Sequence, residues 1–271
     1  MYRTYVAEVD MTSPDRGAKT EHQHSRRTMS FQLRMLFLAQ LVASSVAVPR
    51  SSRSVRHVER DAAVGRVRGV RQTVLGRRDV DIFLGIPFAR PPVGELRFRR
   101  PEVARPWTGT WDATRLPATC FQAIDQAFGR FRGVDMWNPN TNMSEDCLYL
   151  NIWQPIDSGG ETRRRKDGGN GGGKAVMVWI YGGGFYSGTS TLELYDGRII
   201  AAKSDVVVVS MQYRIGPLGF LYLGVPEVPG NQGLLDQQLA LQWIYNYIQA
   251  FGGDRQRITL FGESSGAAST R

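Results

Sequence analysis

Short apolar runs that alternate with helical patterns most constrain the fold of this chain. The runs are rich in β-branched and aromatic residues, and the later ones are apolar at nearly every position. Such runs suit strands that are covered on both faces, as in a largely parallel sheet. We expect strands at 64–75, 80–86, 148–153, 175–181, 206–211 and 257–261, and helices at 194–202 and 233–251. Strands that alternate with helices predict an α/β fold, with a mostly parallel sheet and flanking helices.

The longer expected helix, 233–251, has one apolar face. Its apolar residues at helical spacing are Leu234, Leu241, Ile244 and Ile248. This spacing predicts that they face the core. The glycine pair at 252–253 follows the last apolar turn and is expected to end the helix.

The N-terminal part of the chain does not read as part of a folded domain. Residues 1–28 have no helical or strand period and are interpreted as a disordered or misassigned leader. Residues 29–47 have the shape of a secretory signal peptide that begins at Met29, with a membrane anchor as the weaker alternative. A basic linker at 48–63 then precedes the domain at 64–271. We therefore expect a secreted, extracellular protein.

The net charge of +9 does not indicate a nucleic-acid partner. Residues 1–60 hold ten Lys and Arg against five Asp and Glu, so they carry +5 of it. The basic cluster at 163–166, inside a glycine-rich stretch expected to be a surface loop, accounts for the remaining +4. Because the rest of the domain is near neutral, the high pI is a poor argument for nucleic-acid binding.

A strand, a sharp turn and a helix start surround Ser264. The β run at 257–261 passes directly into Gly262-Glu-Ser-Ser-Gly266. A nucleophile elbow has this form, since small neighbours permit a strained turn that exposes the serine. The sequence therefore predicts that Ser264 is a nucleophile, with a glycine- and serine-rich helix entry as the alternative.

Three consecutive glycines, 182–184, follow another buried run. Backbone N–H groups in such a stretch can approach a substrate without intervening side chains, as acyl transfer requires. A phosphate-binding loop is the alternative, but no Gly-Lys-Ser/Thr follows, which excludes a P-loop. The glycine stretch and the elbow together predict one ester-hydrolysing site, with no cofactor and no metal.

Five motifs resemble the type B carboxylesterase family of α/β hydrolases: residues 145–151, 182–188, 230–237, 251–254 and 262–266. Within this family, residues 136–140 and 179–187 resemble the cholinesterases. The likeness covers about 64–271, roughly the N-terminal half of the family's domain. It implies an α/β-hydrolase fold, here cut off after the strand that leads into the elbow.

The resemblance also implies roles for residues around the elbow. Ser264 is the nucleophile, and the N–H groups of Gly183, Gly184 and Ser265 form the oxyanion hole. Glu263 adds negative potential beside the nucleophile. The family usually has Ala where this chain has Ser265, whose hydroxyl is expected to affect local packing.

The same resemblance implies a site for choline esters such as acetylcholine. Trp137 corresponds to the tryptophan that holds the quaternary ammonium, which an indole face attracts. Asp125 corresponds to an acidic residue of a peripheral site, where it would steer cations inward. Tyr186 and Tyr195 match tyrosines that line the substrate path. Simple packing roles are the alternative for Trp137 and both tyrosines.

The two cysteines, Cys120 and Cys147, are spaced as the family's first disulfide loop, which encloses Trp137. A disulfide is the expected state in an exported chain, and two buried thiols are the alternative. Asn142 lies inside this loop in an Asn-Met-Ser sequon and is a predicted glycosylation site.

The acid and the histidine of a catalytic triad are not found after Ser264. In this fold both follow the nucleophile in the chain, and the sequence ends at Arg271. We therefore expect a fragment or incomplete gene product with negligible turnover. The alternatives are a general carboxylesterase and a non-catalytic adhesion or binding protein. The resemblance leaves open a homo-oligomer, a membrane tether, and a synaptic or cell-surface location.

Overall fold

The computed structural model describes residues 55–127, 129–157 and 172–270. The expected leader at 1–28, the signal peptide at 29–47 and most of the basic cluster's loop lie outside the described residues. Within the described part of the chain, no helix is long and apolar enough to cross a membrane.

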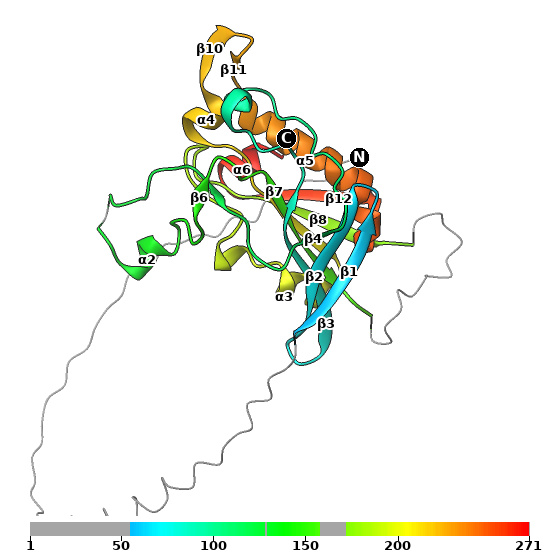
Figure 1. Cartoon of the computed structure of the whole chain (residues 1–271). Coiled ribbons are helices and arrows are strands. Elements are labelled where there is room, and N and C mark those ends of the chain that lie inside the picture. The colour runs from blue at the N-terminus through cyan, green and yellow to red at the C-terminus, as the bar shows by residue number, and fades with distance from the viewer. Residues whose placement is uncertain (1–54, 128, 158–171, 271) are drawn as a thin grey trace, which may run out of the picture. The chain divides into compact units, whose positions relative to one another are not determined.

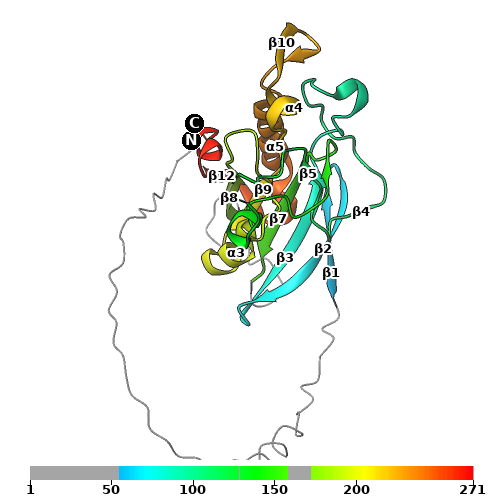
Figure 2. The ribbon, with the colours of Figure 1, turned by 90° about the vertical axis from the view of Figure 1, so that its left-hand side faces the viewer.

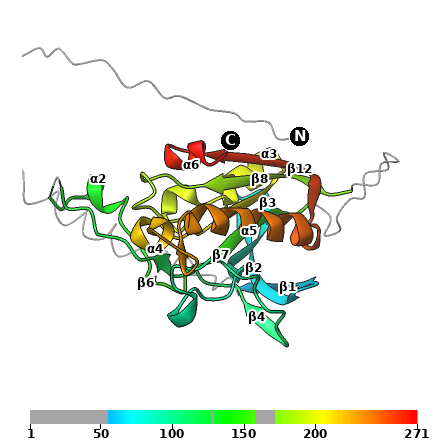
Figure 3. The same cartoon turned by 90° about the horizontal axis from the view of Figure 1, so that it is seen from above.

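An eight-stranded sheet forms the centre of the domain, in the order β1-β2-β3-β7-β9-β8-β12, with β4 paired to β2. Its strands are β1 Arg56–Ala62, β2 Gly65–Val74, β3 Arg78–Pro87, β4 Thr110–Asp112, β7 Tyr149–Pro155, β8 Lys174–Ile180, β9 Val207–Met211 and β12 Gly253–Gly262. Seen from above, β12 lies at one side of the sheet, and β1 and β4 lie at the other (Figure 3).

The sheet is mixed, so the expectation of a mostly parallel sheet is wrong. The pairs β1–β2, β2–β3, β3–β7 and β7–β9 are antiparallel, whereas β8–β9, β8–β12 and β2–β4 are parallel. The apolar runs indicate strands that are buried on both faces. Antiparallel strands in the middle of a covered sheet are also buried on both faces, so they have the same sequence pattern as parallel strands. Strand direction therefore could not be read from the runs.

The basic linker expected at 48–63 also needs correction, because β1 occupies Arg56–Ala62 and pairs antiparallel with β2. Most of its side chains are exposed or half-buried, so it lacks the apolar alternation that marks a strand. Its charged residues instead form ion pairs: Arg56 bonds Asp79, and Arg60 bonds the fully buried Asp81. The ordered domain thus begins before residue 64.

Helices cover both faces of the sheet (Figures 1 and 2). Alternate residues of one strand enter different core clusters: Ile152 packs in the larger cluster with α5, Gln232–Tyr247, and Trp153 packs in the smaller one with α3, Arg198–Ser204. Since successive strand side chains point to opposite faces, α5 and α3 lie on opposite sides of the sheet.

The expected apolar face of the 233–251 segment is largely confirmed: Ile244 and Ile248 are fully buried, and Leu241 packs against the core. Leu234 is the exception, because it is 41% exposed. The buried residues of α5 are Gln232, Gly233, Asp236, Gln237, Ala240, Trp243 and Ile244. The polar residues among them could not be recognised from a pattern of apolar residues. The helix continues into the 3₁₀ turn η3, Ile248–Phe251, which Gly252 ends in the left-handed conformation, as expected.

The remaining elements are short. They are η1 Gly94–Leu96, β5 Thr119–Cys120, α2 Arg132–Asp135, β6 Met143–Ser144, η2 Glu193–Tyr195, α4 Gly216–Phe220, β10 Tyr222–Val225, β11 Val228–Pro229 and α6 Ser265–Ala268. Strands β10 and β11 form a hairpin that projects beyond α4, and α2 lies on a loop away from the sheet (Figure 1).

Candidate active site

Ser264 lies on a strained turn between β12 and α6. Its backbone has φ 53° and ψ −123°, and its side chain is exposed. A non-glycine residue in such a conformation is costly and is found where function requires a particular side-chain direction. The turn is therefore the sharp bend that the sequence predicted, with the hydroxyl facing outward.

This turn packs closely against the end of β8 because glycines, which have no side chain, lie at the contact. A Cβ atom on Gly182 would lie 3.0 Å from the Cβ of Ser264 and 2.4 Å from the carbonyl oxygen of Glu263. A Cβ atom on Gly266 would lie 2.1 Å from the carbonyl oxygen of Ile180. Both approaches exclude any larger residue. The structure thus brings the glycine stretch and the elbow together across β8 and β12.

The glycine stretch forms a tight turn. Gly183, Gly184 and Phe185 have positive φ values of 115°, 60° and 64°, and the N–H groups of Tyr186 and Ser187 bond the carbonyl of Gly183. The N–H groups of Gly183 and Gly184 donate to no acceptor among the described residues. They remain free to bind an external oxygen.

Ser265 begins α6 directly after the nucleophile. The first N–H groups of a helix lack an acceptor within it, and the N–H of Ser265 has none among the described residues. The side-chain Oγ accepts a hydrogen bond from the N–H of Phe185 at 3.3 Å. The hydroxyl of Ser265 therefore joins the elbow to the glycine turn.

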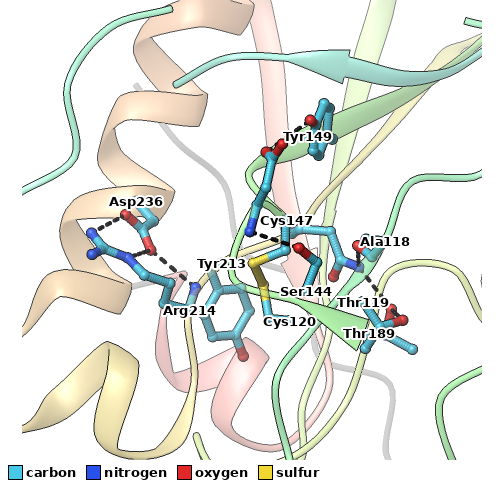
Figure 4. The surroundings of a disulfide bond; sticks show 12 residues. Ala118, Thr119, Cys120, Ser144, Cys147, Tyr149, Thr189, Tyr213, Arg214 and Asp236 are labelled. Atoms are coloured by element: carbon cyan, nitrogen blue, oxygen red, sulfur yellow. Dashed lines mark hydrogen bonds and ion pairs between the residues drawn. A yellow bond between two sulfur atoms is a disulfide. The ribbon is translucent and has the colours of Figure 1, made fainter. Parts of the chain in front are cut away.

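Cys120 and Cys147 form the expected disulfide. The loop that they close is fastened to the chain that follows the glycine turn. The Gln122 amide accepts from the N–H of Gly188 and donates to its carbonyl, both at 2.8 Å. Next to the disulfide, the Thr119 hydroxyl lies 3.0 Å from that of Thr189 (Figure 4).

Trp137 and Asp125 lie on this disulfide loop. Asn138, next to Trp137, bonds the N–H and the carbonyl of Asp125 through its side chain, so the two segments are held side by side. Trp137 itself is 52% exposed. Among the described residues, no hydrogen bond or ring contact joins Trp137 to Ser264. The structure thus places the segment that carries Trp137 beside Asp125.

The two predicted tyrosines differ in environment. Tyr186 is 69% exposed at the glycine turn. Tyr195 is half-buried, with its ring 5.0 Å from the ring of Trp179. Burial raises the pKa of Tyr195, and the nearby carboxylate of Glu263 adds to the effect.

A buried ion pair behind the glycine turn was missed by sequence reasoning. The guanidinium of Arg214 makes two 2.8 Å bonds to the carboxylate of Asp236, and the backbone N–H of Arg214 makes a third at 2.9 Å (Figure 4). Asp236 is fully buried. The sequence feature that could have indicated this ion pair is Asp236, an acidic residue on the buried face of α5.

A pair of tyrosines adjoins this ion pair. Tyr181 and Tyr213 stack with ring centroids 4.4 Å apart, and each hydroxyl donates to the other's carbonyl oxygen. These bonds fasten the end of β8 to the end of β9, directly under the glycine turn.

None of the described residues supplies an imidazole to Ser264. His57 lies on β1, and five strands separate β1 from β12. At about 4.8 Å per strand, the distance across the sheet is roughly 29 Å. His57 therefore cannot act as the base for Ser264.

Comparison with known proteins identifies the family. The Carboxylesterase family profile matches residues 56–271. The chain belongs to the carboxylesterase family. This membership implies an α/β-hydrolase fold, which agrees with the mixed sheet and its flanking helices.

The curated relatives include three cholinesterases. A cholinesterase from Mus musculus is 53% identical over 218 residues, which are 79% of this chain and 34% of the relative. Acetylcholinesterases from Electrophorus electricus and Bungarus fasciatus are each 53% identical over 76% of this chain, covering 31% and 32% of the relative. The chain spans about a third of the length of these relatives.

Proposed function

We propose that this carboxylesterase-family chain carries the nucleophile and the oxyanion hole of a serine hydrolase of carboxylic esters. The observation that carries the proposal is the close packing of Gly182 against the strained, exposed Ser264, together with the N–H groups of Gly183, Gly184 and Ser265, which have no acceptor among the described residues. Each such donor contributes about 3–4 kcal/mol to the stabilisation of an oxyanion.

The reaction proceeds through an acyl-serine. The Oγ of Ser264 attacks the ester carbonyl, and its proton passes through a general base to the departing alcohol. The resulting oxyanion accepts hydrogen bonds from the three N–H groups. Water then attacks the acyl carbon, which releases the acid and restores Ser264. The base, an imidazole in enzymes of this type, comes from outside the described part of the chain.

Choline esters are the proposed substrate class. Trp137 offers a half-exposed indole face, and Asp125 is held beside it on the same loop. Glu263 adds an exposed carboxylate next to the nucleophile. The three cholinesterase relatives favour this reading over a general carboxylesterase or a non-catalytic adhesion protein.

Replacing Trp137 with Ala in the protein as its natural source produces it tests the substrate class. An indole face contributes about 0.5–2 kcal/mol to binding a quaternary ammonium, so the preference for a choline ester over a neutral isostere should fall about 2- to 30-fold. The measurement is kcat/KM for both esters.

Phe131→Ala is the matched control, because Phe131 is an aromatic residue on the same loop with similar exposure, 55%. It should leave the preference unchanged. If the unsubstituted protein hydrolyses neutral esters as well as choline esters, the result would favour the general carboxylesterase. No turnover of either ester by the unsubstituted protein would favour the adhesion protein.

We also propose that the protein is exported and glycosylated at Asn142. The disulfide is typical of an oxidising compartment, and Asn142 is exposed on the loop that the disulfide closes. Asn142→Gln should abolish a mobility shift that N-glycosidase removes from the secreted protein. Ser144→Thr preserves the sequon and should keep the shift; persistence of the shift in Asn142→Gln would place the glycan elsewhere.

A further inference from the structure

The hydroxyl of Ser265 occupies a junction between three segments. Ser265 is 7% exposed, so its side chain points into the protein while Ser264 beside it faces outward. Its Oγ accepts from the N–H of Phe185, the residue that follows the three glycines. Burial raises the pKa of the Tyr213 hydroxyl, and hydrogen bonding with the Ser265 hydroxyl partly opposes this effect.

Phe185 needs external support. Its φ of 64° lies in the left-handed region, which a bulky side chain adopts at a cost of about 1–3 kcal/mol unless the surroundings hold it. Both of its backbone groups are held: the N–H by Ser265, and the carbonyl by the N–H of Gly216 at 2.7 Å. Its ring lies 5.2 Å from that of Phe220 in α4.

Fixing Phe185 also fixes the two glycines before it. The carbonyl of Gly183 is bound by the N–H groups of Tyr186 and Ser187, so the turn from Gly183 to Ser187 is held together by its own hydrogen bonds. Two hydrogen bonds hold Phe185 in place. The bond from Gly216 joins the turn to the start of α4, and the bond to the Ser265 hydroxyl joins the turn to α6, directly after the nucleophile.

We propose that the Ser265 side chain is a positioning group for the oxyanion hole. Its hydroxyl sets the Gly183 and Gly184 N–H groups relative to Ser264, while its own N–H serves as the third donor. A chain with Ala at this position has the donor but not the positioning bond. The catalytic consequence rests on the proposed esterase function; the positioning bond does not.

Amide hydrogen exchange on the full chain tests the bond independently of turnover. In Ser265→Ala and Ser265→Cys, exchange in the 183–187 segment should be about fivefold faster, the factor for an ordinary hydrogen bond of roughly 1 kcal/mol. Exchange elsewhere in the domain should be unchanged. Ser265→Thr retains the hydroxyl and should keep exchange in this segment slow.

Ser269→Ala is the matched control, because Ser269 directly follows α6 and its hydroxyl bonds the carbonyl of Ser265 rather than the glycine turn. It should leave exchange at 183–187 unchanged. Unaltered exchange in both Ser265→Ala and Ser265→Cys, equally fast exchange in Ser265→Thr, or acceleration spread over the whole domain would each overturn the positioning role. Absence of ester turnover in the unsubstituted protein would instead count against the proposed function alone.

Discussion

Ser264→Ala is expected to abolish ester hydrolysis and labelling by a fluorophosphonate in the native gene product. The loss in kcat should approach about 10⁶-fold, the effect of removing a serine nucleophile in other hydrolases. The reason is geometric: Ser264 is the exposed hydroxyl on the strained turn, and the glycine stretch lies against it. Peptide mapping of the labelled protein and steady-state kinetics measure the two outcomes.

The neighbouring serines make this test specific. Ser265 is buried and Ser269 bonds a backbone carbonyl, so neither hydroxyl is free to attack a substrate. Ser269→Ala should retain both labelling and turnover. Labelling of another residue in Ser264→Ala, with turnover intact, would move the nucleophile away from the elbow and refute the proposed site.

The elbow and the glycine turn were predictable because their requirements are local. The strained φ of Ser264 and the positive φ of Gly183 and Gly184 are properties of short stretches, and small residues mark them in the sequence. The larger strands and helices were found for the same reason, since each carries its own apolar run. The family motifs added the disulfide, which the structure confirms.

Pairing between distant segments could not be predicted. β1 pairs with β2 through backbone bonds and carries charged side chains whose partners lie elsewhere, as Arg60 and Asp81 show. β7 and β9 are antiparallel because of the path that the chain takes between them, and the residues of the two strands do not indicate this direction. The hydrogen bond between Ser265 and Phe185 could not be predicted for the same reason, because the two residues lie 80 positions apart in the chain.

Asp236→Asn is expected to destabilise the protein by about 3–5 kcal/mol, because it leaves the charge of Arg214 buried without a counter-ion. Asn keeps an oxygen that can accept from the backbone N–H of Arg214, so the change tests the charge itself. Burial raises the pKa of Asp236, and the donations from Arg214 oppose that effect. Urea unfolding measures the free energy, and the melting temperature should fall by roughly 6–20 °C.

The double variant Arg214→Met with Asp236→Asn should recover most of this stability, since no unpaired charge then remains in the core. An Asp236→Asn variant that unfolds at the same urea concentration as the unsubstituted protein would show that the pair is dispensable. The pair also lies next to the site: Arg214 follows Tyr213, and two residues later Gly216 holds the carbonyl of Phe185. If the ion pair fixes this segment, the double variant should recover most of the stability but only part of the ester turnover, because the segment is then packed but no longer held by three bonds.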